Sequence, residues 1–333
     1  MAKCSLIVDI IIGELTVLES SAVVHHVKNP LCPIVAVQCK GDDLRKAVSA
    51  ALECGYRHID TAALYENEDV IGDVLRQWIT TGRVSREELF ITTKLPPIGN
   101  RPSDVEKYLS QSLKKLKVDY VDLYLIHAPI SAIPEGEDDV RGKILDFSTD
   151  LEAVYKVMEQ QVDAGRARGI GLSNFNSKQI ERIMKVCRIK PVNLQVEVHA
   201  YFQQKPLRSL CRQFDISVCA YCPLGAPHLH RDDSEKYPRL IEHPVVTSMA
   251  LRLNKTPAQI LLRHLIQLGL IVIPKSVSPE RIQENFQVWD FKLPPSDMAD
   301  LDALDRGGDG RVINFQLRPG VQNHPEYPFS IPF

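Results

Sequence analysis

Eight short apolar runs, each separated from the next by a longer amphipathic stretch, constrain the fold of this chain more than any other feature. Short runs rich in β-branched residues are typical of strands, whereas apolar residues spaced three or four apart are typical of helices. Strands that alternate with helices indicate parallel βαβ units, and eight such runs favour a closed (β/α)8 TIM barrel over an open sheet. The runs lie near residues 34–38, 56–60, 89–94, 121–126, 168–172, 192–196, 216–221 and 270–274.

The amphipathic stretches carry helix-start signals. Ser, Thr and Asp side chains accept hydrogen bonds from the free N–H groups of a first helical turn, and Pro is favoured at the first helical position. The signals are Asp42 before Leu44, Ser103 before Val105, Ser177 before Ile180, and Thr256 before Pro257.

No linker, repeat or low-complexity tract divides the 333 residues, which predicts a single α/β barrel domain over 1–333. We expect residues 1–32 to form an atypical N-terminal segment, in which Leu15 to Val24 suits a hairpin strand that closes one end. Three intervals are longer than a barrel needs and should shape a substrate pocket at the C-terminal face. They are 128–148, 222–243 and the C-terminal loop and tail, 305–333.

The charge balance and the N-terminus bear on partners and location. A net charge of −2 argues against nucleic acid or an anionic membrane as the main partner, so we expect a small molecule. The apolar run from Leu6 to Ile12 is interrupted by Asp9, which is unsuited to a signal peptide or membrane span.

Cysteine usage favours reduced thiols in a cytoplasmic protein, because the spacing is not that of a disulfide scaffold. Cys219 and Cys222 have the C-x-x-C form of a redox or zinc pair. They lie in a strand-like run where residues three apart point to opposite faces, and no second pair completes a zinc site. We therefore predict no metal. The eight cysteines are Cys4, Cys32, Cys39, Cys54, Cys187, Cys211, Cys219 and Cys222.

Four polar residues lie at or just past the ends of consecutive apolar runs: Asp60, Tyr65, Lys94 and His127. Neighbouring strands lie about 4.8 Å apart, so side chains at adjacent strand ends can converge on one volume. Alone, the tyrosine would be a packing residue and the aspartate a turn residue. Together, at the end of a barrel where active sites lie, they predict a catalytic cluster.

The residue types suggest acid–base chemistry on an oxygen. A free tyrosine has a pKa of about 10, and a nearby Lys94 ammonium would favour the phenolate and lower that pKa. Asp60 would keep Lys94 protonated and in place, and His127 could hydrogen-bond a substrate oxygen.

At several places the sequence resembles the aldo-keto reductase family, with the insect-type members as the suspected branch. The resemblance runs from about Pro33 to Phe329. Its motifs are Gly55–Glu68 around HIDTAALYENE, Ile91–Leu95, Leu123–Pro129, Gly171–Asn176, Asn193–Glu197, Ala220–Gly225 and Ile273–Phe286.

The resemblance implies a (β/α)8 barrel that reduces aldehydes and ketones to alcohols with NADPH and acts as a monomer. Asp60, Tyr65, Lys94 and His127 fall on the family's catalytic tetrad. Hydride would pass to the carbonyl carbon while Tyr65 protonates the oxygen.

The resemblance also implies cofactor contacts, and the chain has no G-x-G-x-x-G dinucleotide motif. The nicotinamide carboxamide would bind Ser173, Asn174 and Gln195, and its ring would stack on Tyr221. Leu224 would also contact the cofactor. The 2′-phosphate would bind Lys275, Ser276 and Arg281, and the adenine would contact Glu284 and Asn285.

Two departures from the family pattern matter. The segment Pro33 to Lys40 is shorter than the family's first strand and turn, which puts its cofactor contacts in doubt. Pro96 and Ala128 stand where aromatic residues often line the pocket. A wider pocket predicts a bulky apolar carbonyl substrate, such as a long-chain aldehyde or a steroid ketone.

Two other functions fit parts of the pattern. Lys94 could form a Schiff base in an aldolase, although an adjacent Asp60 would keep it charged and a poor nucleophile. Alternatively, the barrel could be a non-catalytic NADPH-binding sensor, a regulatory subunit or a structural protein.

Overall fold

The computed structural model describes residues 34–35, 41–136, 139, 142, 144–227, 238–315, 319–331 and 333. The predicted hairpin strand from Leu15 to Val24 lies outside the described residues. So does most of the altered segment from Pro33 to Lys40, of which only Ile34–Val35 is described.

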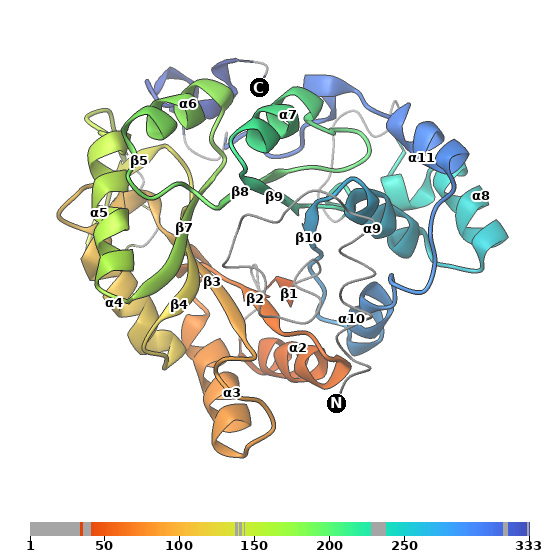
Figure 1. The fold of residues 1–333 in the computed structure, drawn as a ribbon, viewed down its shortest axis with the longest axis horizontal. Coiled ribbons are helices and arrows are strands. Elements are labelled where there is room, and N and C mark those ends of the chain that lie inside the picture. The colour runs from red at the N-terminus through yellow and green to blue at the C-terminus, as the bar shows by residue number, and fades with distance from the viewer. Residues whose placement is uncertain are drawn as a thin grey trace.

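An eight-stranded parallel sheet forms the centre of the molecule, and Figure 1 shows it curving inside a ring of helices so that its last strand returns towards its first. Every strand pairs with strands adjacent to it in chain order among the eight, with all pairs parallel. The predicted (β/α)8 fold and the positions of its eight strands are confirmed. In sheet order the strands are β1 (Ile34–Val35), β2 (His58–Asp60), β3 (Phe90–Leu95), β4 (Val121–Ile126), β7 (Ala167–Ser173), β8 (Asn193–Glu197), β9 (Ser217–Tyr221) and β10 (Ile271–Ile273).

Helices connect the strands and cover the outside of the sheet (Figure 1). Thr256 caps α9 as predicted, in a capping box with Gln259. At α6 the cap is Asn176 rather than the predicted Ser177, because Asn176 and Gln179 bond to each other's backbone N–H groups. The helices are α2 (Gly41–Cys54), α3 (Glu68–Thr80), α4 (Val105–Leu116), α5 (Leu151–Asp163), α6 (Ser177–Val186), α7 (Lys205–Gln213), α8 (Pro244–Leu253), α9 (Pro257–Gln267), α10 (Pro279–Phe286) and α11 (Pro295–Asp302).

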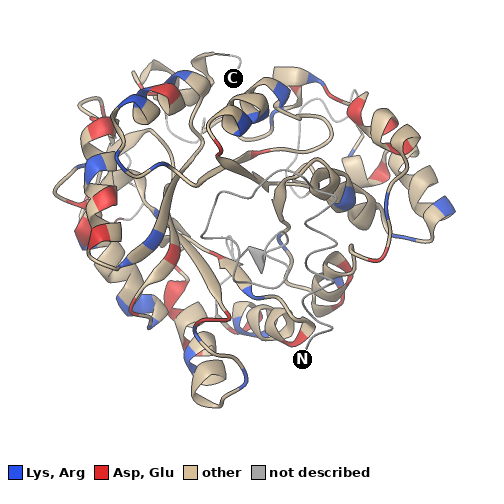
Figure 2. Cartoon of the chain, in the orientation of Figure 1, with Lys and Arg blue, Asp and Glu red and all other residues tan. Residues whose placement is uncertain are grey.

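The main hydrophobic core lies between the sheet and these helices. Strands β3 and β4 are buried along their whole length, as expected when both faces of a parallel sheet are covered. A second apolar cluster packs α8, α9 and α11 together through residues such as Val246, Ile260 and Leu301. Figure 2 shows Lys, Arg, Asp and Glu of both signs mainly on the outer helices. None of the described helices combines the length and the apolar character needed to cross a lipid bilayer.

The long intervals hold short irregular elements. The interval after β4 contains an antiparallel hairpin, β5 (Ser131–Ile133) and β6 (Ile144–Asp146), which Arg101 holds through Asp146 at 2.5 Å. Residues 228–237 of the interval after β9 lie outside the described part. The C-terminal tail folds back onto α6, where Glu326 accepts hydrogen bonds from Gln179 and Arg182.

Candidate active site

The four predicted catalytic residues lie at the C-terminal ends of three neighbouring strands. Asp60 ends β2, and Lys94 is the last residue but one of β3. His127 follows β4 directly, and Tyr65 ends the short 3-10 helix Ala63–Tyr65 that follows β2. Because β2, β3 and β4 pair in parallel register, these side chains reach one end of the barrel together.

The Lys94 ammonium group is the centre of the cluster. It is fully buried and donates hydrogen bonds to the Asp60 carboxylate, to the Thr61 carbonyl oxygen at 2.9 Å and to the Tyr65 hydroxyl at 3.5 Å. An ammonium has three donors, so all three are used. A buried lysine is stable only when its charge is paired and its donors are satisfied, and here both conditions hold.

The surroundings shift the pKa values of Lys94 and Tyr65. Burial alone would lower the pKa of Lys94, but Asp60 and the Tyr65 oxygen together raise it. Burial raises the pKa of Tyr65, and although Lys94 opposes this shift, the pKa stays above its usual value. The lowering effect of Lys94 was predicted correctly. The predicted net lowering was wrong, because burial outweighs the lysine.

His127 borders the same volume from the other side of Tyr65. The two rings meet edge to face, with centroids 5.5 Å apart and planes at 83°. His127 is half-buried, and its carbonyl oxygen accepts a hydrogen bond from the Asn174 amide at 2.8 Å. The imidazole of His127 and the phenol of Tyr65 could therefore both hydrogen-bond the oxygen of a carbonyl compound bound between them.

The predicted nicotinamide residues lie on three neighbouring strands, with Ser173 at the end of β7, Tyr221 at the end of β9 and Gln195 in the middle of β8. Asn174 donates to the Ser173 hydroxyl at 3.1 Å and accepts from the Tyr221 hydroxyl at 2.7 Å. Asn174 also has a left-handed backbone, with φ of 62°, which turns the chain sharply after β7. Gln195 instead donates to the second carboxylate oxygen of Asp60 at 2.7 Å, so it contacts the predicted catalytic cluster directly.

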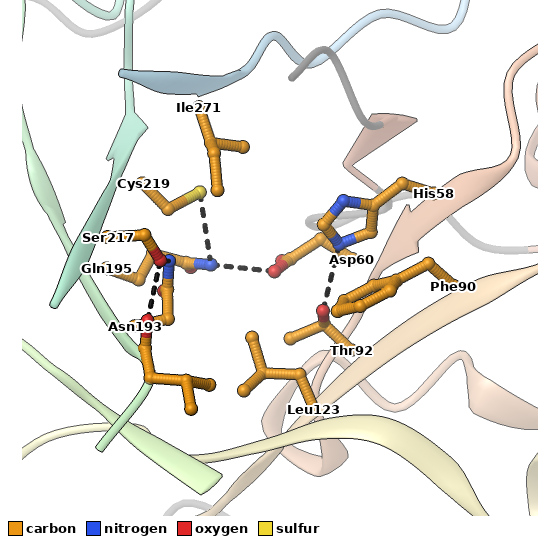
Figure 3. Close-up of a pocket in the computed structure, with 11 residues that line it drawn as sticks. His58, Asp60, Phe90, Thr92, Leu123, Asn193, Gln195, Ser217, Cys219 and Ile271 are labelled. Atoms are coloured by element: carbon orange, nitrogen blue, oxygen red, sulfur yellow. Dashed lines mark hydrogen bonds between the residues drawn. The ribbon is translucent and has the colours of Figure 1, made fainter. Parts of the chain in front are cut away.

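Beneath this cluster, a cavity lies inside the barrel (Figure 3). Figure 3 shows the Gln195 amide between Asp60 and Cys219, with His58 bonded to Thr92 on the opposite wall. The cavity joins the Asp60 carboxylate to polar groups in the barrel interior. It is lined by His58, Asp60, Phe90, Thr92, Leu123, Val192, Asn193, Gln195, Ser217, Cys219 and Ile271.

The predicted phosphate and adenine residues lie after β10 and along α10. Lys275 and Arg281 are exposed, and Ser276 is half-buried. Asn285 is buried and Glu284 is half-buried on the same helix. Leu224 is half-buried and packs against both hydrophobic clusters.

Glu197 is not among the predicted site residues, although it ends one of the motifs that the sequence shares with the family. Glu197 is the last residue of β8, is 1% exposed and accepts three hydrogen bonds through its carboxylate. The available signal was a carboxylate at the end of an apolar run, the same signal that identified Asp60.

The described cysteines, Cys54, Cys187, Cys211, Cys219 and Cys222, are all free. Burial raises the pKa of Cys222 to about 12, so its thiol is protonated at neutral pH. Within the described ranges, no three His, Cys, Asp or Glu side chains are grouped to hold a metal ion.

Comparison with known proteins identifies relatives over most of the chain. The model of the aldo/keto reductase family matches residues 36–306. Prostaglandin F synthase 2 of Bos taurus is 42% identical over 290 residues, which covers 86% of this chain and 88% of the relative. Estradiol 17 beta-dehydrogenase 5 of Mus musculus is 41% identical, with 85% and 88% covered. The solved structure of the aldose reductase from Schistosoma japonicum superposes with a TM-score of 0.82 at 39% identity, covering 91% of this chain and 96% of that one. Insect-type membership stays a prediction.

Proposed function

Because this chain belongs to the aldo/keto reductase family and is an oxidoreductase, we propose that it reduces aldehydes and ketones to alcohols with NADPH as the electron donor. The observation that carries this proposal is the buried Lys94 ammonium, hydrogen-bonded to both Asp60 and Tyr65. A proton donor held against a buried ion pair, at the active-site end of a barrel, suits protonation of an oxygen that gains negative charge.

Each residue of the cluster has a proposed role. Tyr65 donates its proton to the carbonyl oxygen, and its raised pKa keeps it protonated at neutral pH. The Lys94 ammonium stabilises the phenolate that forms, and Asp60 keeps Lys94 charged. His127 orients the substrate oxygen beside Tyr65.

The chain offers suitable groups for NADPH, which supplies a hydride when bound. Ser173 and Asn174 present hydroxyl and amide groups that suit a carboxamide. Tyr221 adds an aromatic ring at the end of β9. We propose that Gln195 joins them, and that Leu224 lines the same site. Lys275, Ser276 and Arg281 would hold the 2′-phosphate, which favours NADPH over NADH, and Glu284 and Asn285 would contact the adenine.

The substrate we propose is a bulky apolar carbonyl compound, such as a long-chain aldehyde or a steroid ketone. Pro96 directly follows β3, two residues after Lys94, and Ala128 directly follows His127. Neither residue brings an aromatic ring to this end of the barrel. The names of two relatives, a prostaglandin F synthase and an estradiol dehydrogenase, support a large apolar substrate. We further propose one domain, acting as a cytoplasmic monomer, and the free thiols of the described residues support that location.

The rival functions receive less support. A Schiff-base aldolase needs a neutral lysine, but the raised pKa of Lys94 keeps this one charged. A non-catalytic NADPH sensor does not need a buried Asp60–Lys94–Tyr65 cluster, which is costly to bury without a use.

The direct test follows NADPH oxidation at 340 nm with a panel that ranges from small aldehydes to steroid ketones, with NADH in parallel. We expect turnover that prefers NADPH and has its highest kcat/KM with bulky apolar carbonyls. Tight NADPH binding without turnover of any carbonyl would instead favour the sensor.

A further inference from the structure

A buried carboxylate beside the active site binds the C-terminal tail. Glu197 accepts hydrogen bonds from the backbone N–H groups of Val312 at 2.7 Å and Ile313 at 2.8 Å. It also accepts one from the His199 ring at 2.9 Å. Glu197 stands in register with Tyr221 on the neighbouring strand, so the tail is attached next to the proposed nicotinamide platform.

The residue before Val312 adds a second attachment. The guanidinium carbon of Arg311 lies 3.9 Å from the ring centre of Phe329 and 4.4 Å from that of Phe202. A cation over the face of an aromatic ring is attracted to the ring by a cation–π interaction, and this attraction is stronger when water is excluded. Arg311 and Glu197 line one pocket together with Asn174 and Tyr221, so the opposite charges of the tail and the strand end share that pocket.

Gly310 shows how closely the tail fits. A Cβ atom added there would lie 2.0 Å from the carbonyl oxygen of Tyr201, so no other residue fits without moving the backbone. Two residues earlier, a Cβ atom on Gly308 would meet nothing within 4 Å. The tail therefore packs tightly against the Tyr201 backbone at Gly310 but leaves open space at Gly308.

We infer that Glu197 and Arg311 form a latch that fixes the tail segment, residues 310–315, against the ends of β8 and β9 and thereby sets how much room a bulky substrate has. Glu197 is a positioning residue in this account and takes no part in the proton transfer. The substrate aspect rests on the proposed carbonyl reductase function, whereas the attachment of the tail does not.

The latch requires that both oxygens of the Glu197 side chain accept hydrogen bonds, as they do in a carboxylate. Three donors converge on its two carboxylate oxygens, and only a carboxylate has acceptors on both atoms. In Glu197→Gln the side chain keeps its size, but one oxygen becomes an NH2 group that faces a donor. A buried donor left without an acceptor is unfavourable, so the tail segment should open more often.

The test compares two variants that disturb the latch from opposite sides. Glu197→Gln changes the strand side, and Gly310→Ala pushes the tail away with Glu197 intact. Matched controls are Glu106→Gln, at a carboxylate that is 62% exposed on α4, and Gly308→Ala. Hydrogen–deuterium exchange of the peptide spanning residues 306–315 reports the tail directly, and KM and kcat are measured with one small aldehyde and one steroid ketone.

We expect both latch variants to speed exchange in this peptide by about tenfold or more, with little change in the controls. We expect a rise of about fivefold or more in KM for the steroid ketone, with kcat for the small aldehyde nearly unchanged. Unchanged exchange in both variants would refute the latch. Faster exchange with equal changes in KM for both substrates would refute its effect on bulky substrates. A wild-type protein that reduces no carbonyl would refute the proposed function, while the exchange result would still decide whether the latch exists.

Discussion

Lys94 is a fully buried cation in the barrel, so it is stable only if its charge is paired and its donors are satisfied. Its three donors are satisfied by Asp60, Thr61 and Tyr65, and its charge is balanced by one carboxylate. That carboxylate is itself held by Gln195. Breaking such a pair leaves an uncompensated buried charge, which costs far more than loss of a surface ion pair.

Replacement of Asp60 should therefore be costly. In Asp60→Asn the Lys94 ammonium loses its anion, so we expect the free energy of unfolding at neutral pH to fall by about 3 to 5 kcal/mol. Carbonyl reduction should fall as well, because a neutralised lysine cannot stabilise the phenolate. Urea unfolding measures the stability change. Asp163→Asn, at an ion pair whose carboxylate is 53% exposed, is the control and should cost less than about 1 kcal/mol. Equal losses in the two variants would contradict this account of Lys94.

At the residue scale, the sequence predicted the cluster of Asp60, Lys94 and Tyr65, but it did not predict that Gln195 also contacts Asp60. Strand-end positions brought Asp60, Lys94 and Tyr65 together as expected. The Gln195 amide donates to both Asp60 and Cys219, and these partners depend on tertiary packing. The net pKa shift of Tyr65 depends on its burial, which residue type and spacing do not reveal.

At the scale of elements, β3 serves two sides of the sheet. Lys94 faces Asp60 and Tyr65. Its neighbour Thr93 donates a hydrogen bond of 2.6 Å to Glu68, the first residue of α3. Glu68 is 1% exposed, and burial raises the pKa of its carboxyl group. The attachment of α3 to β3 therefore includes a carboxyl group that ionises less readily than a free glutamate.

This carboxyl group should make stability depend on pH. A group whose pKa is raised on folding contributes stability that is present below its unfolded pKa, about 4.3 for Glu, and is lost as pH rises through the folded value. Glu68→Gln removes the titration and keeps an acceptor for Thr93. We expect the unfolding free energy of the wild type, minus that of this variant, to fall as pH rises from about 4 to about 7.

Urea unfolding across that pH range gives the difference directly. Glu53→Gln, at a carboxylate that is 59% exposed, should leave the pH dependence of the wild type unchanged. A difference between wild type and Glu68→Gln that rises with pH would show that the pKa of Glu68 is lowered on folding.

Elements were predictable where local sequence determines them. The eight strands follow from apolar β-branched runs, and Thr256 caps α9 as its spacing with Gln259 suggests. The β5–β6 hairpin was predicted only as a long interval, because Arg101 and Asp146, which hold it, are 45 residues apart. Asn176 caps α6 rather than Ser177, although both residue types can cap a helix. The capping box that Asn176 forms with Gln179 decides between them.

At the scale of the whole molecule, the barrel gathers groups from distant parts of the sequence at one end. The tetrad comes from the first half of the chain, the proposed nicotinamide contacts from β7 to β9, and the proposed phosphate contacts from the region after β10. The order of the strands and their burial made this gathering predictable. The loops and tail that shape the pocket were not, because long-range contacts such as those of Glu197 fix them.

Cofactor binding should stabilise the folded molecule. A ligand that binds only the folded state adds about 2.7 kcal/mol at 100 times its Kd, so NADPH should raise Tm in a concentration-dependent manner. Arg281→Ala should reduce the rise with NADPH and leave any rise with NADH unchanged. Thermal unfolding monitored by circular dichroism checks this, with Arg188→Ala, 59% exposed and on the surface, as the control. Equal stabilisation by NADPH and NADH would argue against the proposed 2′-phosphate site.

The proposed function depends above all on Tyr65 as the proton donor in carbonyl reduction. The most direct measurement is single-turnover NADPH oxidation at 340 nm with a bulky ketone, in wild type, Tyr65→Phe and Tyr120→Phe. Tyr120 immediately precedes β4, at the opposite end of the barrel from the tetrad, and is the matched control. We predict a rate loss of about 100-fold or more in Tyr65→Phe, a near wild-type rate in Tyr120→Phe, and unchanged NADPH binding in both. A Tyr65→Phe variant that reduces the ketone at the wild-type rate would rule out Tyr65 as the proton donor.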